Sequence, residues 1–186
     1  MEEVLCGIDE AGRGPLAGPL VIAGVILQSP IAGLDDSKKL TAKRRETLYP
    51  LILKQSRYRI VSFSAEQIDR DGLSACLREG LMELKGFFGD GVAYLYDGNT
   101  AFGVDDVRTL IKADAQIPEV AAASILAKVT RDRAMIEAAR RYPQYGFERH
   151  KGYGTRDHID AILTHGRCAI HRKSFRIKRV DEPTLF

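Results

Sequence analysis

A stretch rich in glycine and proline, residues 7–19, joins two short apolar segments near the start of the chain, and it limits the possible fold more than any other feature of the sequence. Its residues read Gly-Ile-Asp-Glu-Ala-Gly-Arg-Gly-Pro-Leu-Ala-Gly-Pro. Short apolar runs joined by such a stretch are typical of two β-strands connected by a turn. We therefore predict strands over Val4–Asp9 and Leu20–Leu27, with the turn between them.

Two carboxylates stand side by side in this stretch, at Asp9 and Glu10, and they repel each other unless a cation lies near them. Hard cations such as Mg²⁺ prefer carboxylate oxygens. The glycines that follow lack a Cβ, so their backbone N–H groups can come close to a phosphate, and the guanidinium of Arg13 suits the same anion. Carboxylates for metal beside donors for phosphate indicate hydrolysis of a phosphodiester. The alternative is an acidic turn that is simply solvated.

The remaining pattern of apolar residues predicts an α/β domain with a mixed central sheet flanked by helices. Further strands are expected over Tyr58–Ser64, Val92–Tyr96 and Val107–Ile111. Helical spacing predicts helices over Thr41–Gln55, Leu73–Phe88, Pro118–Arg141 and Thr155–His165. We expect a catalytic core over residues 1–141 and a basic, helical C-terminal portion with a tail over residues 142–186.

Positive charge gathers toward the end of the chain, although the net charge of the whole is only +3. Residues 149–179 hold nine Lys and Arg against two Asp, which gives this segment +7 and the rest of the chain −4. An acidic body with a basic end fits a protein that binds metal in one part and a phosphate backbone in another. A basic surface without a partner is the alternative. All four histidines lie in this segment without the close pairing of zinc ligands, so we expect none of them to bind metal.

Three scattered cysteines, Cys6, Cys76 and Cys168, fit free thiols in a reducing cytoplasm better than a disulfide framework. The acidic start of the chain, with Glu2 and Glu3, is unlike a signal peptide. No apolar run reaches the roughly 18 residues of a membrane span. We therefore expect a cytoplasmic protein.

Acidic residues at the ends of predicted strands are candidates for metal binding, because strand ends bring distant positions together at one edge of a sheet. Asp9 and Asp97 end apolar strands, and Asp114 follows the last strand closely. Two divalent ions about 3.5–4 Å apart need several carboxylates around them. The candidate set is Asp9, Glu10, Asp97 and Asp114.

Some of these residues have plainer alternatives. Asp97 lies in Tyr-Asp-Gly-Asn, and Asp-Gly is a common turn. Asp114 could pair with Lys112 or cap the next helix, and Asp132 is a rival for its place. Asp132 follows Lys128 by four residues, however, and a helical ion pair accounts for it, so we rank Asp114 above it.

The opening stretch resembles, nearly residue for residue, the opening motif of the ribonuclease HII family, the type 2 ribonucleases H. The resemblance continues in order along nearly the whole chain. Its further motifs are Asp36-Ser37-Lys38-Lys39-Leu40, Tyr96-Asp97-Gly98-Asn99, Lys112-Ala113-Asp114, Ala121 to Asp132, His150-Lys151-Gly152-Tyr153-Gly154-Thr155 and His171-Arg172-Lys173-Ser174-Phe175. Two departures, Ala113 where many members have Gly and Gly154 where many have Pro, remove no side-chain ligand.

This resemblance implies a ribonuclease H-like fold and an endoribonuclease that depends on Mg²⁺ or Mn²⁺. It implies cleavage of RNA–DNA hybrids and of single ribonucleotides in duplex DNA, leaving 5′-phosphate and 3′-hydroxyl ends, as in ribonucleotide excision repair. It also implies that Asp9, Glu10, Asp97 and Asp114 bind the metal and catalyse the reaction. The expected substrate-binding residues are Gly12, Arg13, Gly14, Lys38, Lys39, Tyr153, Arg172 and Lys173.

Tyr153, between two glycines, suits recognition of RNA, because telling RNA from DNA requires contact with a 2′-hydroxyl. A core tyrosine on a loop is the alternative. Two other functions stay open on the sequence alone. A junction-resolving nuclease of the same fold would need no 2′-hydroxyl, and a non-catalytic nucleic-acid-binding domain is expected to lack the carboxylates.

The last residues, Glu182-Pro183-Thr184-Leu185-Phe186, loosely resemble the short Leu-Phe-ending peptides that bind DNA sliding clamps. An exposed apolar pair would serve as an anchor in a partner's hydrophobic pocket. Folding of Leu185 and Phe186 back onto their own domain is the alternative. A sliding clamp is therefore a possible partner besides the nucleic acid.

Overall fold

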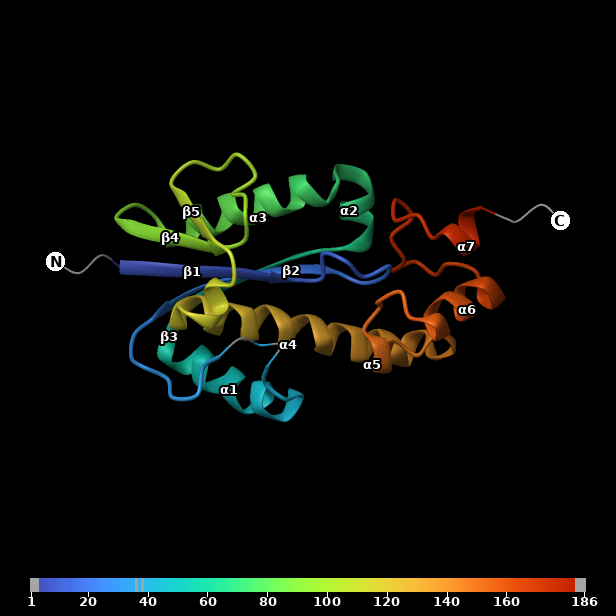
Figure 1. The fold of residues 1–186 in the computed structure, drawn as a ribbon, viewed down its shortest axis with the longest axis horizontal. Helices are drawn as coiled ribbons and strands as arrows, with labels where there is room; N and C mark the ends of the chain where they lie inside the picture. Colours follow the sequence, from blue (N-terminus) through green and yellow to red (C-terminus); the bar gives the residue numbers. More distant parts are fainter. Residues whose placement is uncertain (1–3, 36, 38, 183–186) are drawn as a thin grey trace.

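The computed structural model describes residues 4–35, 37 and 39–182 (Figure 1). Within these ranges the strands form one five-stranded sheet in the order β3-β2-β1-β4-β5. β1 pairs antiparallel with β2 and parallel with β4, so the sheet is mixed, as predicted. The strands are β1 (Val4–Ala11), β2 (Leu20–Leu27), β3 (Ser56–Phe63), β4 (Val92–Asp97) and β5 (Val107–Leu110).

Helices cover both faces of the sheet (Figure 1). α1 (Ala42–Gln55) and α4 (Pro118–Arg141) pack on one face, and α2 (Ala65–Asp71) and α3 (Leu73–Phe88) pack on the other. Side chains of β2 alternate between the two faces of the sheet, so the strand contributes to both hydrophobic cores. Ile22 packs with α3, whereas Val21 and Val25 pack with α1 and α4. Gly7 of β1 lets α4 pass directly over the strand, since a Cβ there would clash with the backbone of Glu119 and Val120.

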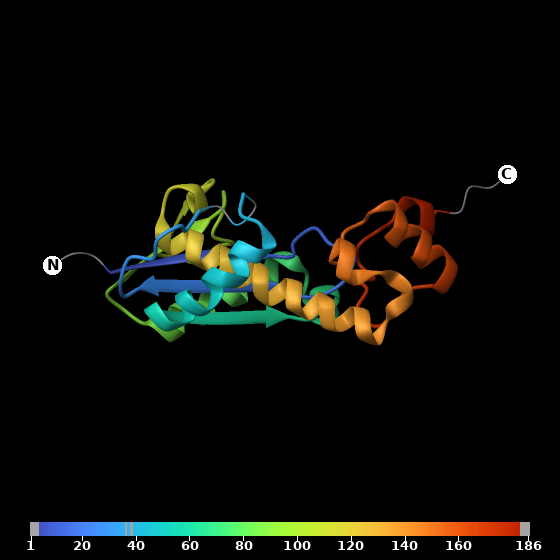
Figure 2. The same cartoon turned by 90° about the horizontal axis from the view of Figure 1, so that it is seen from below.

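The C-terminal elements gather at one end of the sheet, beyond the strands (Figures 1 and 2). They are η2 (Pro143–Tyr145), α5 (Phe147–His150), α6 (Arg156–His165) and α7 (Lys178–Asp181). α4 continues past the sheet into this part, where Met135 joins a core cluster with Tyr145, Phe147 and Ile162. The division of the chain at residue 141 stays a prediction.

The structure differs from the sequence-based expectations in several short elements. The helices α2, α5 and α7 were not expected, nor were the 3₁₀ turns η1 (Ala113–Ala115) and η2. α2 does carry a readable signal, because Ser64 and Gln67 form a capping box at its start. α5 and α7 have four residues each, too few for an apolar period to be visible.

Two predicted strand ends also need correction. β1 continues to Ala11 because residues 9–11 pair with residues 21–23 of β2, so Asp9 lies inside the strand rather than at its end. β5 ends at Leu110, and Asp114 lies in η1 beyond it. β2 has the predicted bounds, and the bounds of β3 and β4 differ from the prediction by at most two residues.

None of the helices in the described ranges is both long and apolar enough to cross a membrane. The three cysteines are all free thiols, and Cys6 and Cys76 are buried.

Candidate active site

Three carboxylates from distant parts of the chain converge at one end of the central strands. Asp9 comes from β1, Asp97 from the end of β4 and Asp114 from η1, and one carboxylate oxygen from each lies within 4.8 Å of the others. β1 and β4 are parallel neighbours in which Ile8 pairs with Tyr96, so the next residue of each strand is an aspartate. Strand pairing therefore brings Asp9 and Asp97 together, although Asp9 lies inside β1 rather than at its end.

The Asp97 carboxylate fixes the loop that carries Asp114. Its Oδ1 accepts a hydrogen bond from the Lys112 N–H at 3.0 Å, and its Oδ2 accepts one from the Asp114 N–H at 3.3 Å. Lys112 has the left-handed conformation, with φ of 60°, which turns the chain sharply after β5. Asp114, almost fully buried, is thereby directed toward Asp9 and Asp97.

Asp9 is a buried carboxylate in a crowded acidic environment. Burial raises its pKa well above the usual range, and the charge of Glu10 raises it further, while a hydrogen bond to Ser124 opposes the shift. The Glu10 N–H donates to Asp9 Oδ1 at 2.8 Å. A buried carboxylate of this kind, whose ionisation is disfavoured without a counter-charge, fits a site for a divalent cation.

Glu10 lies beside this triad rather than in it. Its Oε2 accepts a hydrogen bond from the Tyr96 hydroxyl at 2.6 Å, and its Oε1 lies 3.5 Å from Arg13 Nη1. Burial raises the pKa of Glu10, while the Tyr96 and Arg13 contacts lower it. The expected role of Glu10 as a fourth ligand stays a prediction.

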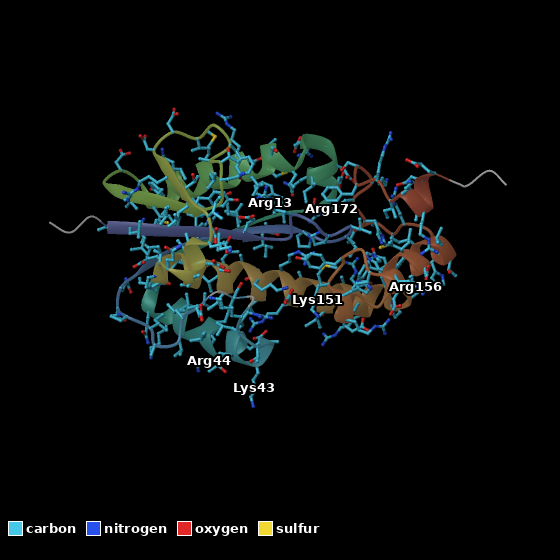
Figure 3. All side chains as sticks on the ribbon, viewed as in Figure 1. Arg13, Lys43, Arg44, Lys151, Arg156 and Arg172 are labelled. Atoms are coloured by element: carbon cyan, nitrogen blue, oxygen red, sulfur yellow. The ribbon has the colours of Figure 1, made fainter. Side chains whose placement is uncertain are left out.

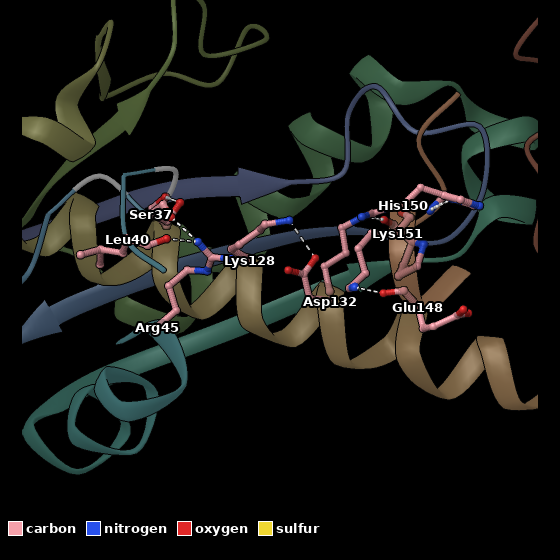
Figure 4. Close-up of polar contacts among 12 residues, drawn as sticks. Ser37, Leu40, Arg45, Lys128, Asp132, Glu148, His150 and Lys151 are labelled. Carbon is pink, nitrogen blue, oxygen red and sulfur yellow. Dashed lines mark hydrogen bonds and ion pairs between the residues drawn. The ribbon is translucent and has the colours of Figure 1, made fainter. Parts of the chain in front are cut away.

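The rival residue Asp132 is occupied elsewhere (Figure 4). Lys128 Nζ lies 2.8 Å from Asp132 Oδ1, four residues along α4, which is the helical ion pair considered from the sequence. Among the described residues, the cluster of acidic side chains includes Asp114 and not Asp132. The geometry thus favours the ranking made from the sequence.

A cavity of about 350 Å³ opens beside the carboxylates. Its lining includes Asp9 and Glu10, the turn residues 12–14, Tyr153, and Ser124 and Lys128 of α4. Arg13 and Tyr153 are exposed, the latter at 44%. Four of the residues that were predicted to bind substrate, Gly12, Arg13, Gly14 and Tyr153, therefore line the cavity next to the acidic cluster.

The other predicted substrate-binding residues have different surroundings. Lys38 lies outside the described residues. Lys39 is exposed, with Nζ 3.4 Å from Asp35, and Lys173 is exposed while its N–H donates to Asp69. Arg172 is buried, and backbone carbonyls accept its hydrogen bonds, so its expected contact with a phosphate stays a prediction.

Two residues that the sequence analysis did not single out hold the segment around Ser37 (Figure 4). Arg45 of α1 donates from Nη1 to the carbonyls of Ser37 and Leu40, at 2.6 Å each. The Ser37 hydroxyl lies 2.7 Å from the Ser124 hydroxyl, next to Asp9. Ser37 stands among charged residues in the sequence, which gives no sign that its hydroxyl is buried against Ser124 of α4.

A relay of neutral imidazoles supports the loop that carries Tyr153. The Tyr153 carbonyl can only accept, so His158 Nδ1 must donate to it, at 2.8 Å. His158 Nε2 then accepts from His171 Nε2 at 3.0 Å, and His171 Nδ1 accepts from the Cys168 N–H at 2.8 Å. Burial lowers the pKa of both imidazoles, that of His171 to about 4.

Basic side chains come from several parts of the chain (Figure 3). Arg13 lies at the turn, Lys43 and Arg44 project from α1, and Lys151 and Arg156 belong to the C-terminal part.

Comparison with known proteins agrees with the resemblance read from the motifs. The family model for ribonuclease HII matches residues 6–84 and 93–178. Ribonuclease HII of Sulfurovum sp. (strain NBC37-1) is 63% identical over 182 residues, covering 98% of this chain and 96% of the relative. Ribonuclease HII of Aliarcobacter butzleri (strain RM4018) is 53% identical, covering 96% of this chain and 93% of the relative.

Solved structures share the fold. RNase HII from Archaeoglobus fulgidus, determined in a complex with PCNA, matches with a TM-score of 0.74 at 28% identity, covering 94% of this chain and 96% of that chain. Ribonuclease H2 from Pyrococcus horikoshii OT3 matches with a TM-score of 0.68 at 25% identity, covering 92% and 93%. Bst-RNase HIII in complex with Mn²⁺ matches with a TM-score of 0.70 at 20% identity, covering 92% and 67%. The expected ribonuclease H-like α/β fold is confirmed.

Proposed function

The chain belongs to the ribonuclease HII family, a group of ribonuclease H enzymes, and on that premise we propose that it cleaves RNA–DNA hybrids and single ribonucleotides within duplex DNA. The products carry 5′-phosphate and 3′-hydroxyl ends, because water rather than the 2′-hydroxyl attacks the phosphodiester. The observation that carries the proposal is the acidic triad of Asp9, Asp97 and Asp114 beside a cavity that the glycine turn and Tyr153 line.

The enzyme depends on divalent metal, and Mg²⁺ or Mn²⁺ is the proposed ion. Asp9, Asp97 and Asp114 supply hard oxygen donors that fit either ion, and Glu10 is proposed to join them. Bound there, divalent ions supply the Lewis acidity that phosphodiester hydrolysis needs. The raised pKa of Asp9 supports this assignment, since a carboxylate that resists ionisation alone is stabilised by a nearby cation.

The protein's own groups orient the substrate. Tyr96 donates its hydroxyl hydrogen to Glu10 and so holds that carboxylate at the edge of the cavity. The turn residues Gly12, Arg13 and Gly14 are proposed to contact the ribonucleotide and its phosphate, and Tyr153 to contact the junction with DNA. A phenol can offer both a hydroxyl and a stacking face to the nucleotide.

The exposed basic residues are proposed to hold the duplex. Lys39 and Lys173 are exposed. Lys38, which lies outside the described residues, is proposed for the same role on its place in the sequence motif alone. Phosphate contacts of this kind position a duplex without reading its sequence.

A gel assay with a duplex that carries one ribonucleotide tests the proposal. Cleavage on the 5′ side of that nucleotide, only with Mg²⁺ or Mn²⁺ and with 3′-hydroxyl ends that a polymerase extends, is the expected result. Asp114→Asn should lose at least about a hundredfold in rate, whereas Asp132→Asn should stay near the wild-type rate. A near-wild-type rate in Asp114→Asn, with loss in Asp132→Asn instead, would contradict the choice of Asp114.

An all-DNA four-way junction, used as the substrate, distinguishes a junction-resolving nuclease from the proposed ribonuclease. A junction-resolving nuclease would cut it without any 2′-hydroxyl, and we expect no cleavage. A non-catalytic nucleic-acid-binding domain would bind both substrates and cut neither.

A sliding clamp is proposed as a partner through the C-terminal residues, which lie mostly outside the described part of the chain. The Archaeoglobus relative in complex with PCNA supports it. Deleting Thr184 to Phe186 should abolish clamp binding with an unchanged melting temperature. A lower melting temperature, in a protein whose intact form binds no clamp, would favour the fold-back alternative. The proposed compartment for this activity is the cytoplasm.

A further inference from the structure

Two arginines with almost no solvent exposure lie beneath the glycine turn. Arg131 of α4 is 0% exposed, and Arg172 of the C-terminal part is 1% exposed. Neither forms an ion pair with a carboxylate in the described part of the chain. Burial, and next the charge of Arg131, lowers the pKa of Arg172 to about 10. Burying unpaired charge costs free energy, so their hydrogen bonds must offset a substantial penalty.

Those hydrogen bonds go to the backbone of the turn. Arg172 donates to the Gly12 carbonyl at 2.6 Å, to the Arg13 carbonyl at 3.2 Å and to the Gly18 carbonyl at 2.9 Å. Arg131 donates to the Pro19 carbonyl at 3.0 Å and to the Ala17 carbonyl at 3.1 Å. Together they fix both ends of the turn.

The direction of these carbonyls determines the direction of two amides. In a trans peptide the C=O and the N–H point to opposite sides. Because the Gly12 and Arg13 carbonyls point at Arg172, the N–H groups of Arg13 and Gly14 point away from it. Neither N–H donates to an acceptor among residues 4–35, 37 and 39–182. Residues 12–14 line the cavity beside Asp9, so two unused donors belong to its wall.

Arg131 also links the turn to Tyr153. Its Nη2 donates to the Lys151 carbonyl at 2.9 Å, and its guanidinium carbon lies 5.6 Å from the centre of the Tyr153 ring. Its Nη1 is buried without a hydrogen-bond partner in the described structure. One side chain therefore fixes the turn and supports the exposed aromatic ring, and both line the cavity.

We propose that Arg131 and Arg172 are positioning residues that aim the Arg13 and Gly14 amides and the Tyr153 ring at the ribose, and so set the discrimination between ribonucleotide and deoxyribonucleotide. This inference rests on the proposed function. The two arginines do not touch the reacting phosphate; they act through the backbone that they orient. The amides donate to the 2′-oxygen, which a deoxyribose lacks.

Binding measured in a protein inactivated by Asp9→Asn tests the inference directly. The quantity is the ratio of Kd for an all-DNA duplex to Kd for the same duplex with one ribonucleotide, in Mg²⁺. Arg131→Lys and Arg172→Lys keep the charge but cannot reach all the carbonyls. Each should reduce the ratio about tenfold, the worth of a hydrogen bond to a charged or well-aligned group, with less than a twofold change in the Kd for DNA.

Arg133→Lys is the matched control, because Arg133 is an exposed arginine of the same helix that pairs with Glu46. It should leave the ratio unchanged. A purely structural role would lower the melting temperature of the Arg131 and Arg172 variants while the ratio stays at the parent value, and that result would overturn the inference. A ratio near one in the parent protein would instead overturn the proposed function, and this inference with it.

Nuclear magnetic resonance keeps the inference testable if the lysine variants do not fold. In the Asp9→Asn protein with both arginines intact, the amide signals of Arg13 and Gly14 should shift on addition of the ribonucleotide duplex and not on addition of the all-DNA duplex. Equal shifts with both duplexes would refute it.

Discussion

Replacing Gly12 by alanine should destabilise the protein strongly, because two independent features of this position exclude a side chain. Gly12 has φ of 105°, a conformation that costs other residues about 1–3 kcal/mol. An ideal Cβ would lie 2.5 Å from the Pro19 carbonyl oxygen and 2.7 Å from Arg131 Cδ. Neither neighbour can move away without a cost in free energy. The first is a backbone atom, and the second belongs to an arginine side chain whose guanidinium donates to three backbone carbonyls.

The backbone conformation and the overpacking, which adds about 1–3 kcal/mol, both lower the free energy of unfolding. Alanine also makes the unfolded chain stiffer than glycine does, which offsets up to about 1 kcal/mol of this, so the net loss of stability is about 3 kcal/mol. For a chain of this length each kcal/mol shifts the melting temperature by about 2–4 °C, so a fall of about 6–12 °C is expected. Thermal unfolding followed by circular dichroism measures it.

Gly14→Ala is the control for this prediction. A Cβ at Gly14 meets nothing within 4 Å, so the melting temperature should stay within about 2 °C of wild type. If Gly12→Ala melts as high as Gly14→Ala, the close approach of Arg131 to the turn is not a real constraint, and the rigidity assigned to the turn is wrong.

Three more predictions concern charge. Asp9→Asn should abolish cleavage yet raise the metal-free melting temperature at pH 7, because burial and the charge of Glu10 raise the pKa of Asp9, so that its ionisation destabilises the fold. A lower melting temperature of the variant would contradict this. Added Mn²⁺ should stabilise the wild-type protein more than the variant. Acidification from about pH 6.5 to 4 should remove the stability that His171 contributes, because its pKa is lowered to about 4 and it binds a proton more readily when unfolded. Protonation of Asp9, whose pKa is raised, acts in the opposite direction, so the test is the difference between variants. In urea titrations the change in the free energy of unfolding should be less unfavourable in His171→Asn than in wild type, and the same as wild type in His165→Asn, whose histidine is exposed. Lys173→Ala and Arg176→Ala should each reduce the slope of log K against log salt for duplex binding by about 0.9, and unchanged slopes would mean that the duplex lies elsewhere.

Patterns of apolar residues predicted most of the fold. The five strands and the four long helices follow from short apolar runs and helical spacing, and the convergence of Asp9, Asp97 and Asp114 followed from strands that end near one edge. The exact place of Asp9 did not follow, because pairing with β2 extends β1 by two residues past it. Only the partner strand determines where such a strand ends.

The buried cations could not be predicted. In the sequence, Arg131 stands in a charged run of α4, and Arg172 stands in the basic C-terminal segment, where both resemble solvent-exposed charges. Their burial depends on a turn more than a hundred residues away, whose carbonyls accept their hydrogen bonds. The direction of the Glu10 side chain could not be predicted either, because it depends on a hydrogen bond from the Tyr96 hydroxyl, 86 residues away.

The partners of the glycine turn also impose an order on its assembly during synthesis. Residues 12–19 leave the ribosome early, but the acceptor carbonyls of the turn wait for donors that follow 112 and 160 positions later. Since a chain emerges from its amino end, the acidic triad is complete once residue 114 is out, whereas the wall of the cavity is not complete until Arg172 has emerged. A chain that ends before Arg172 would thus carry the three carboxylates without the arginine whose hydrogen bonds hold the Gly12 carbonyl and orient the turn beside them.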